Sequence, residues 1–479
     1  MTWLDACREA IDGGGLDPSL GDVLLAFGGE EAPGAAALDA PLSLDALPGR
    51  IVAVLEGEVD PHQASLFARR FRGLDALLRE QATPEAPLLR VMLHRRAAQI
   101  LDAPPPHALR IRALVDYVWS QAVRLAHRRP DAPSLEDLAA ALELRTFAPG
   151  LRHGRLAGAS RQGPVHVNVL RAREPRLEAL DARPHGGDLA RLAREQGAPA
   201  ALSGGFFLYS EPDIELPSRR SDPVGLLISG GRLIGPPVFH RAALIQGADG
   251  ALSVERRGMS GVALELGGER VEVGRNAEVV HRAEARQVDA QGGRALAIVA
   301  DRVLACSGGV QDVPLAGFVL RLPPGPAIPP GSTVRYTLPG PPPRAAMAGG
   351  PLLLGPGALD LEAEDFRGSA PPLTFSQDET YDQNLLPRMG AGLTSDGELV
   401  VVAVDGRNAE RAPGLTLRDT ARLLRALGCV RALNLDGGSS KRLVIEGRVV
   451  DLPSTGVVSG GEPEVRPVHS AILVFPGDG

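Results

Sequence analysis

The chain has few aromatic residues and few cysteines. Phe, Trp and Tyr make up 4% of its 479 residues, so aliphatic side chains must form most of any core. The three cysteines, Cys7, Cys306 and Cys429, are far apart and odd in number, which predicts no disulfide framework. No apolar run approaches the roughly 18 residues that a membrane-spanning helix needs, so we expect no membrane span.

A basic charge excess and a secretory signal are also missing. The formal net charge of −7 gives no reason to expect nucleic-acid binding. The first residues, Met1 to Glu9, contain no basic region followed by an apolar core, which predicts a cytoplasmic protein. Export by another route or from a different start site stays open. The sequence does not indicate the oligomeric state.

The chain is instead rich in glycine and proline. It contains 57 Gly and 42 Pro beside a hydrophobic content of 44%, a composition typical of a globular protein with many loops and β-structure. Its length predicts two or three domains.

Residues 1–150 are predicted to form a small helical domain. Residues 1–45 show weak periodicity, but from Ile51 to Phe147 apolar residues recur at helical spacing. Two such faces consist of Leu66, Phe67, Phe71, Leu74, Leu77 and Leu78, and of Ile111, Leu114, Val115, Val118, Ala122 and Leu125. Ser134 is a suitable N-cap for a last helix that would run to Leu144, and Pro149-Gly150 is predicted to begin a linker.

Residues 155–479 are predicted to form a second domain that is mixed and rich in β-structure. Val165, Val167 and Val169 alternate with other residues as in a strand, and short β-like runs separated by Gly and Pro occupy residues 240–340. The segment from Asp365 to Asn384 is polar and is predicted to be a mobile loop. The fold class is therefore α+β, a small N-terminal helical domain followed by a mixed, β-rich α/β domain.

The most informative segment runs from Arg431 to Ser440. An apolar strand is predicted to end at Asp436, and Gly437 and Gly438 then form a turn that leads to Ser439 and Ser440. A helix with N-cap Thr416 and C-terminal Gly428 precedes it, and a buried strand from Glu398 to Val404 comes before that helix. Strand ends of this kind present ligand groups, and glycines let backbone N–H groups approach an anion. Locally, the pattern fits equally well a tight turn in which Asp436 caps its own backbone.

Further motifs change this balance. They are Ser203-Gly204-Gly205-Phe206-Phe207, Gly349-Gly350-Pro351, Pro387-Arg388, Asp405-Gly406-Arg407, and Arg466-Pro467-Val468-His469-Ser470. In their order and spacing, together with the segment around Asp436, they resemble the phosphodiester glycosidase family, which includes the mannose-6-phosphate uncovering enzyme. The resemblance covers about residues 165–475 and implies a phosphodiester glycosidase-like domain.

The chain departs from the family pattern at several positions. Ser203 and Ser470 stand where the family usually has Asn, Met389 stands where it has Thr, and Ser439 replaces a third Gly. The resemblance is retained at Asp436, Arg388, Asp405, Arg407, Ser440 and Arg466. Charged groups are therefore kept while amide and hydroxyl neighbours have changed.

The resemblance implies a hydrolase that cleaves a sugar from a sugar-1-phosphodiester at the anomeric carbon. The alternative is a catalytically degenerate relative that binds an anionic glycan or serves as a scaffold. In either case the expected partner is a phosphorylated carbohydrate or glycoconjugate. A generic α/β hydrolase is disfavoured because the chain has no G-x-S-x-G motif.

The resemblance also implies the site residues. The candidate catalytic residues are Asp436, Arg388 and Ser440, and we expect Asp436, Arg388, Ser203, Ser440 and Arg466 to converge. The candidate substrate-binding residues are Ser203, Gly204, Gly205, Asp405, Arg407, Gly437, Gly438, Ser439, Arg466 and His469. No cofactor and no metal are expected, because the acidic residues Asp378, Glu379 and Asp382 match no known cation-binding spacing. We interpret His469 as an exposed strand residue, with a general-acid role as the alternative.

Overall fold

The computed structural model describes residues 46–207, 223–366, 383–453 and 466–477, apart from the single positions 60, 84, 106, 128, 130, 283, 315 and 409. The acidic residues Asp378, Glu379 and Asp382 lie outside the described residues, as do Cys7, residues 1–45 and most of the predicted loop up to Asn384.

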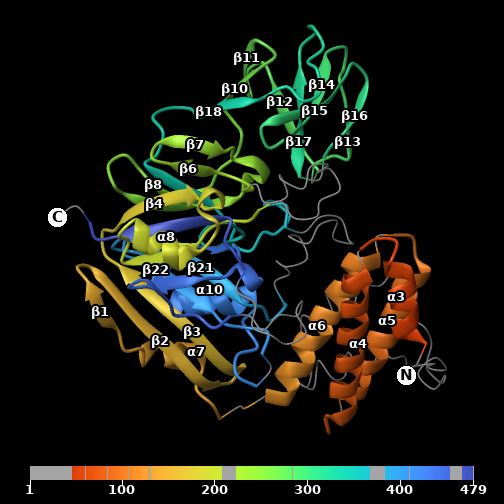
Figure 1. Ribbon diagram of the computed structural model, residues 1–479, viewed down its shortest axis with the longest axis vertical. Coiled ribbons are helices and arrows are strands. Elements are labelled where there is room, and N and C mark those ends of the chain that lie inside the picture. Colours follow the sequence, from red (N-terminus) through yellow and green to blue (C-terminus); the bar gives the residue numbers. More distant parts are fainter. Residues whose placement is uncertain are drawn as a thin grey trace.

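The predicted N-terminal helices are confirmed. The unit contains α3 (Leu47–Leu55), α4 (Pro61–Glu80), α5 (Ala86–Asp102) and α6 (His107–His127), which pack around their own core (Figure 1). The core includes Phe67, Phe71 and Leu74 of α4, from the face that the helical spacing predicts. The carboxylate of Glu58 accepts hydrogen bonds from the first backbone N–H groups of α6, and so caps that helix.

The boundary predicted at residue 150 falls inside the sheet domain. Helix α7 (Leu135–Ala140) is shorter than predicted, and its Leu135 packs with the sheet rather than with the helical unit. Pro149 and Gly150 form the turn between β1 (Arg145–Ala148) and β2 (Leu151–Ser160), with Gly150 at φ +70°. A Pro-Gly pair signals a tight turn as well as a linker, and the turn is what this chain forms. The core of the helical unit contains residues of α3 to α6 and none of α7, so the helical unit ends with α6.

The central element is a seven-stranded sheet in which all neighbouring strands are antiparallel. Its order is β1, β2, β3 (Gly163–Ala172), β22 (Leu399–Val404), β21 (Arg388–Thr394), β23 (Cys429–Leu435) and β20 (Leu352–Leu354). Helix α10 (Leu417–Ala426) connects β22 to β23, with Thr416 as N-cap as predicted. In the sheet, β21 lies between β22 and β23. The segment β22–α10–β23 is therefore not a strand–helix–strand unit with two adjacent parallel strands.

A second sheet packs against the first. It consists of β25 (Arg448–Val449), β24 (Leu443–Ile445), β5 (Ala200–Ser203), β26 (Ser470–Phe475) and β4 (Arg176–Asp181). Helix α8 (Leu189–Glu195), which begins at the N-cap Asp188, packs on the far side of this sheet. The core between the sheets includes Met389, Leu435 and Leu443. The other face of the seven-stranded sheet packs against α7 and α10.

The predicted β-rich region is confirmed and lies away from the helical unit (Figure 1). One sheet contains β7 (Arg232–Gly235), β6 (Leu227–Ser229), β19 (Ala345–Ala348), β8 (Ala242–Gln246) and β9 (Leu252–Arg256). The others are β12 (Glu278–His281), β17 (Gly317–Leu322), β14 (Arg294–Val299) and β15 (Arg302–Ser307); β11 (Glu269–Glu272), β10 (Ala263–Leu266) and β18 (Arg335–Thr337); and β13 (Gln287–Asp289) with β16 (Val310–Asp312). None of the helices that the structure describes is long and apolar enough to cross a membrane.

Candidate active site

The register of β21 and β23 predicts that Arg388 and Asp436 lie on the same face of the seven-stranded sheet. In the pairing of β21 with β23, Met389 is opposite Leu435 and Gly390 is opposite Asn434. Continuing this register by one residue sets Arg388 opposite Asp436. The side chains of Met389 and Leu435 enter the core between the two sheets, so the pleat directs Arg388 and Asp436 to the other face.

Backbone contacts bring the glycine motifs to the same place. The backbone N–H of Asp436 donates to the carbonyl oxygen of Gly204 at 3.1 Å, and that of Gly438 donates to the carbonyl of Pro387 at 2.9 Å. A Cβ atom on Gly437 would lie 2.5 Å from the same Pro387 oxygen. Glycine is therefore required for the turn after Asp436 to pack this closely against the start of β21.

The end of β5 is fixed by two hydroxyl groups, that of its own last residue Ser203 and that of Ser470 on the neighbouring strand β26. Ser203 Oγ accepts a hydrogen bond from the backbone N–H of Arg442 at 3.1 Å, and Ser470 Oγ accepts one from Gly205 at 3.0 Å. A Cβ on Gly205 would lie 2.1 Å from the Ala348 carbonyl oxygen. Ser203 and Ser470, two of the departures from the family pattern, therefore hold the Gly204-Gly205 segment in position.

The guanidinium of Arg388 is held by backbone carbonyl groups. Its Nε donates to the carbonyl of Leu415 at 3.3 Å, and its Nη2 donates to that of Asn384 at 3.1 Å. Arg388 is 2% exposed. The two carbonyls come from segments on either side of β21 and β22 in the sequence, and together they fix the direction of the side chain.

Arg407 and Ser439 contact each other across the turn. Arg407 has a backbone φ of +67°, and its Nη1 donates to Ser439 Oγ at 3.0 Å. Ser439 and Ser440 belong to the short 3₁₀ helix η5 (Gly438–Ser440). The hydroxyl that replaces a third glycine therefore accepts a hydrogen bond from the retained arginine.

Asp405 lies on the opposite face of the sheet from Arg388. Its carboxylate contacts His166 Nδ1 and Lys441 Nζ, and it also accepts a hydrogen bond from the Leu452 backbone N–H at 3.0 Å. Asp405 is 2% exposed. This geometry makes Asp405 a link between the two sheets. Direct contact of Asp405 with substrate stays a prediction of the resemblance that the geometry does not favour.

Lys441, Arg442 and Asp451 extend this buried network. Lys441 is fully buried, and its Nζ donates to Asp451 Oδ2 at 2.9 Å, as does Nη1 of Arg442 at 3.0 Å. Nε and Nη2 of Arg442 are buried and have no hydrogen-bond partner within the described part of the chain. The family motifs do not include these residues. The signal available in the sequence was a Lys-Arg pair directly after Ser440.

His469 is half-buried rather than exposed. Its ring stacks on Phe207 with a centroid distance of 3.8 Å. Burial lowers the pKa of His469, and the nearby charges of Arg183 and Arg466 lower it further. His469 lies one residue before β26 rather than in a strand, and no local sequence pattern reveals that Phe207 packs against it. A neutral ring suits a packing role better than that of a proton donor.

The described residues contain no group of three or more His, Cys, Asp or Glu side chains able to hold a metal ion.

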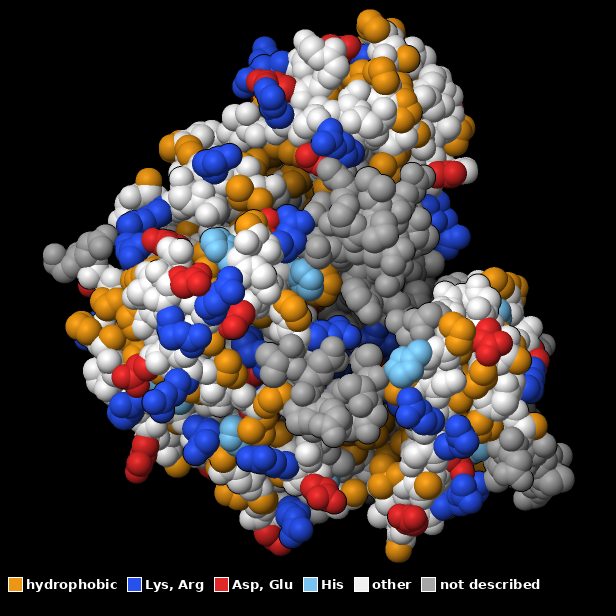
Figure 2. Space-filling model, in the orientation of Figure 1, with side chains coloured by type: hydrophobic (Ala, Val, Ile, Leu, Met, Phe, Trp, Pro, Cys, Tyr) orange, Lys and Arg blue, Asp and Glu red, His pale blue; other side chains and the backbone are white. Residues whose placement is uncertain are grey.

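On its visible face the molecule is hollowed between the helical unit and the sheets, and Lys and Arg side chains line part of this hollow (Figure 2).

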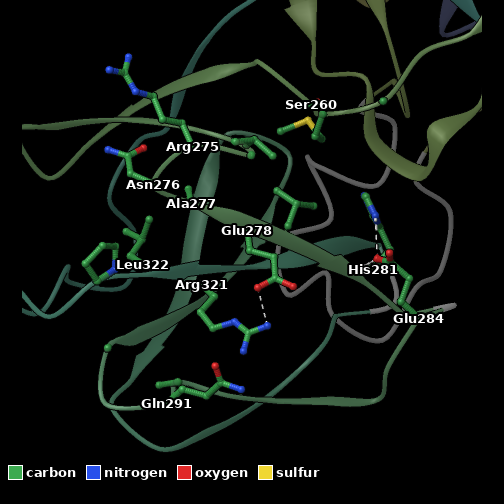
Figure 3. Close-up of a pocket in the computed structure, with 18 of the residues that line it drawn as sticks. Ser260, Arg275, Asn276, Ala277, Glu278, His281, Glu284, Gln291, Arg321 and Leu322 are labelled. Carbon is green, nitrogen blue, oxygen red and sulfur yellow. Dashed lines mark hydrogen bonds and ion pairs between the residues drawn. The ribbon is translucent and has the colours of Figure 1, made fainter.

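A separate groove of about 790 Å³ lies in the β-rich region (Figure 3). Its lining includes Asn276, Glu278, His281 and Arg321, and Glu278 pairs with Arg321 at 2.5 Å across its middle. None of the candidate site residues lines it. The groove is therefore distinct from the site around Asp436.

The sequence profile of the phosphodiester glycosidase family matches residues 196–475, which is more than half of the chain. The chain belongs to the phosphodiester glycosidase family. The matched range contains every candidate site residue from Ser203 to Ser470, so the family assignment confirms the resemblance.

Two relatives match over short segments. The mouse N-acetylglucosamine-1-phosphodiester alpha-N-acetylglucosaminidase is 37% identical over 67 residues, which are 14% of this chain and 13% of the mouse protein. The SPbeta prophage-derived uncharacterized protein YomE of Bacillus subtilis strain 168 is 41% identical over 92 residues, 19% of this chain and 13% of YomE. The chain thus matches about an eighth of the length of each relative.

A solved structure of a hypothetical protein from Synechocystis has a TM-score of 0.45 and 22% identity, with coverage of 73% of this chain and 65% of the other.

Proposed function

We propose that this chain hydrolyses a sugar-1-phosphodiester, releasing the sugar and a phosphate monoester by cleavage at the anomeric carbon. The observation that supports the proposal is the register of β21 with β23, in which Met389 is opposite Leu435 and one further step sets Arg388 opposite Asp436, together with the hydrogen bond from the Asp436 backbone to Gly204. A cation for the phosphate and a carboxylate for the anomeric centre then lie side by side. This is the pair of groups that the reaction needs.

The leaving group explains why one carboxylate suffices. A phosphate monoester leaves far more readily than an alcohol, so it needs little protonation, and the second carboxyl group of ordinary glycosidases is dispensable. Asp436 acts as the nucleophile, as the base that activates water, or as the group that stabilises the oxocarbenium-like transition state. Asp405 is not a second catalytic carboxylate in this proposal, because its oxygens contact His166, Lys441 and Leu452.

Arg442 is the second phosphate-binding group that we propose. It is 3% exposed, and its Nε and Nη2 lack hydrogen-bond partners among the described residues. Buried donors of this kind are costly unless a partner is supplied, and a phosphate oxygen would supply one. Its backbone is hydrogen bonded to Ser203, whose neighbour Gly204 accepts from Asp436. The backbone of Arg442 therefore lies beside the strand ends that carry Ser203 and Gly204.

The mouse relative's name suggests the first substrate to try. Purified chain would be incubated with the 1-(methyl phosphate) diesters of α-linked N-acetylglucosamine, glucose, galactose and mannose, and sugar release would be measured. We expect release from at least one diester by the wild type and a loss of roughly 10²–10⁴-fold in Asp436→Asn. Release that is equal in both proteins, or absent with the whole panel, would refute the proposal for these sugars.

One observation favours the alternative of glycan binding without turnover. Ser203, Ser439 and Ser470 all accept hydrogen bonds from neighbouring residues, so these replacements support loops. Met389 enters the core and does not face the site. If wild type and Asp436→Asn bind a diester equally by calorimetry and neither releases sugar, the binding function stands in place of the hydrolase.

A further inference from the structure

We infer that Ser120 and Arg124 of the N-terminal helical unit are positioning residues for the phosphate clamp Arg388. The expected effect on substrate binding rests on the proposed function. The contacts that position the Arg388 side chain do not depend on catalysis. The helical unit has its own core, so its structure alone does not explain why it is attached to the sheet domain. Two polar contacts of α6 with that domain lead to the groups that hold Arg388.

The first contact is made by Ser120, which is fully buried. Its Oγ accepts a hydrogen bond from the backbone N–H of Leu385 at 2.9 Å and donates to the carbonyl of Asp116 in α6 at 2.7 Å. Leu385 directly follows Asn384, whose carbonyl accepts from Nη2 of Arg388 at 3.1 Å. The helix thus fixes the backbone next to one of the two carbonyls that hold the guanidinium.

The second contact is made by Arg124, one helical turn further along the same face. Its Nη2 donates to Asp419 Oδ2 at 3.0 Å. Asp419 also bonds the N-cap Thr416, and Thr416 directly follows Leu415, whose carbonyl accepts from Nε of Arg388 at 3.3 Å. The same helix therefore supports the second carbonyl through the capping residues of α10.

The two supported segments are also joined to each other. Leu386 and Leu415 exchange backbone hydrogen bonds of 3.3 and 3.2 Å, which close a small loop of contacts around the Arg388 side chain. Because α6 holds both sides of this loop, a shift of the helix would move both carbonyls. A displacement of about 1 Å at a substrate-positioning group is enough to cost up to roughly 10²-fold in rate.

The test uses the full chain with Ser120→Ala and Arg124→Met, which remove each polar contact while preserving much of the side-chain volume. Matched controls in the same unit are Ser65→Ala, an exposed serine of α4, and Arg50→Met, which breaks the exposed ion pair with Asp102. Conservative variants Ser120→Thr and Arg124→Lys keep the hydroxyl and the charge, and serve if either first variant fails to fold.

Backbone hydrogen exchange is measured by mass spectrometry on peptides covering residues 383–390 and 413–420. We expect faster exchange of the first peptide in Ser120→Ala and of both peptides in the double variant, with no change in the controls and a return toward wild type in the conservative variants. Unchanged exchange in both peptides, or equal changes in the controls, would overturn the inference.

Kinetics on any diester that the wild type cleaves separate this inference from the proposed function. We expect the Michaelis constant to rise roughly tenfold in the double variant, in the direction of Arg388→Ala, because both changes weaken phosphate positioning. An active wild type with an unchanged Michaelis constant in the double variant refutes the inference and leaves the hydrolase. An inactive wild type refutes the hydrolase for this panel, and hydrogen exchange then decides the inference.

Discussion

The two faces of the seven-stranded sheet carry charged residues with different surroundings. On the face between the two sheets, the carboxylate of Asp405 contacts the charged side chain of Lys441 and the ring of His166. On the other face, Arg388 is oriented by the backbone carbonyls of Leu415 and Asn384. Val404 pairs with Arg388 in the sheet, so Asp405 is only one residue away from the neighbour of Arg388. The pleat separates a network that joins the sheets from an arginine that backbone carbonyls hold on the other face.

This difference shows that membership of a shared motif does not mean contact with a shared ligand. Asp405 and Arg407 stand in one three-residue motif, yet Asp405 enters the layer between the sheets and Arg407 contacts Ser439. Residues of a motif can be retained for the fold as well as for the chemistry. The comparison can be tested by making the same chemical change on each face.

The largest expected contrast is between Asp436→Asn and Asp405→Asn. Both replace a carboxylate by an amide of the same shape. Asp436→Asn should lower sugar release by roughly 10²–10⁴-fold and change the free energy of unfolding by less than about 1 kcal/mol. Asp405→Asn should instead lower the free energy of unfolding by about 1.5–3 kcal/mol, because it weakens charge-assisted hydrogen bonds in a buried network.

Urea denaturation and the diester assay would be run on both variants. The comparison fails if Asp405→Asn abolishes sugar release at unchanged stability, because Asp405 would then act in catalysis. It also fails if the two variants lose stability equally.

A larger loss of stability than that of Asp405→Asn is expected for Lys441→Met. Lys441 is fully buried between Asp405 and Asp451, so its removal leaves two carboxylates without their shared cation. Breaking a buried ion pair from one side costs about 3–5 kcal/mol, and we expect a loss of that order in the free energy of unfolding. The double variant Lys441→Met/Asp405→Asn should be less unstable than the sum of its parts. Strict additivity in chemical denaturation would show that the two side chains do not interact.

Much of this arrangement was predictable from the sequence, and the reasons for the remainder are physical. The strand ending at Leu435, the N-cap Thr416 and the β-rich region were predicted, because apolar periodicity and capping chemistry are local signals. The order of strands around β21 is set by pairings between distant segments, which no local pattern encodes. For the same reason, the partners of Asp405 and the contacts of α6 with residues near Arg388 could not be predicted.

A smaller effect is expected for Arg442→Met, which retains an elongated buried side chain without the guanidinium. If Nε and Nη2 donate to the substrate phosphate, the Michaelis constant should rise by roughly tenfold or more, because a charge-assisted hydrogen bond contributes about 1.5–3 kcal/mol. Arg425→Met, at an exposed position in the last turn of α10, is the matched control. An unchanged Michaelis constant in an active Arg442→Met protein would assign this arginine to the Asp451 network alone.

The smallest expected effect is on the pH dependence of stability. Burial lowers the pKa of His153, which lies on the inner face and contacts Asn168 Oδ1 at 3.1 Å, and burial also lowers the pKa of His94 in the helical unit. The unfolded chain therefore binds more protons than the folded chain as pH falls below the unfolded value of about 6.5. The stabilisation from these neutral histidines should be fully present above about pH 6.5 and should decline as the pH falls below that value.

Calorimetry from pH 7.5 to 5.0 would measure this decline as a falling unfolding temperature. His153→Gln keeps a polar side chain at this position but cannot become protonated in this range, so it should reduce the slope. The effect concerns the layer between the sheets, where Asn168 of β3 also donates to the Val450 carbonyl at 3.2 Å. Protonation of His153 would place a positive charge in the buried layer between the two sheets, and burial disfavours the charged form of the ring. An unfolding temperature that rises on acidification, or a slope unchanged by His153→Gln, would contradict this account of the inner face.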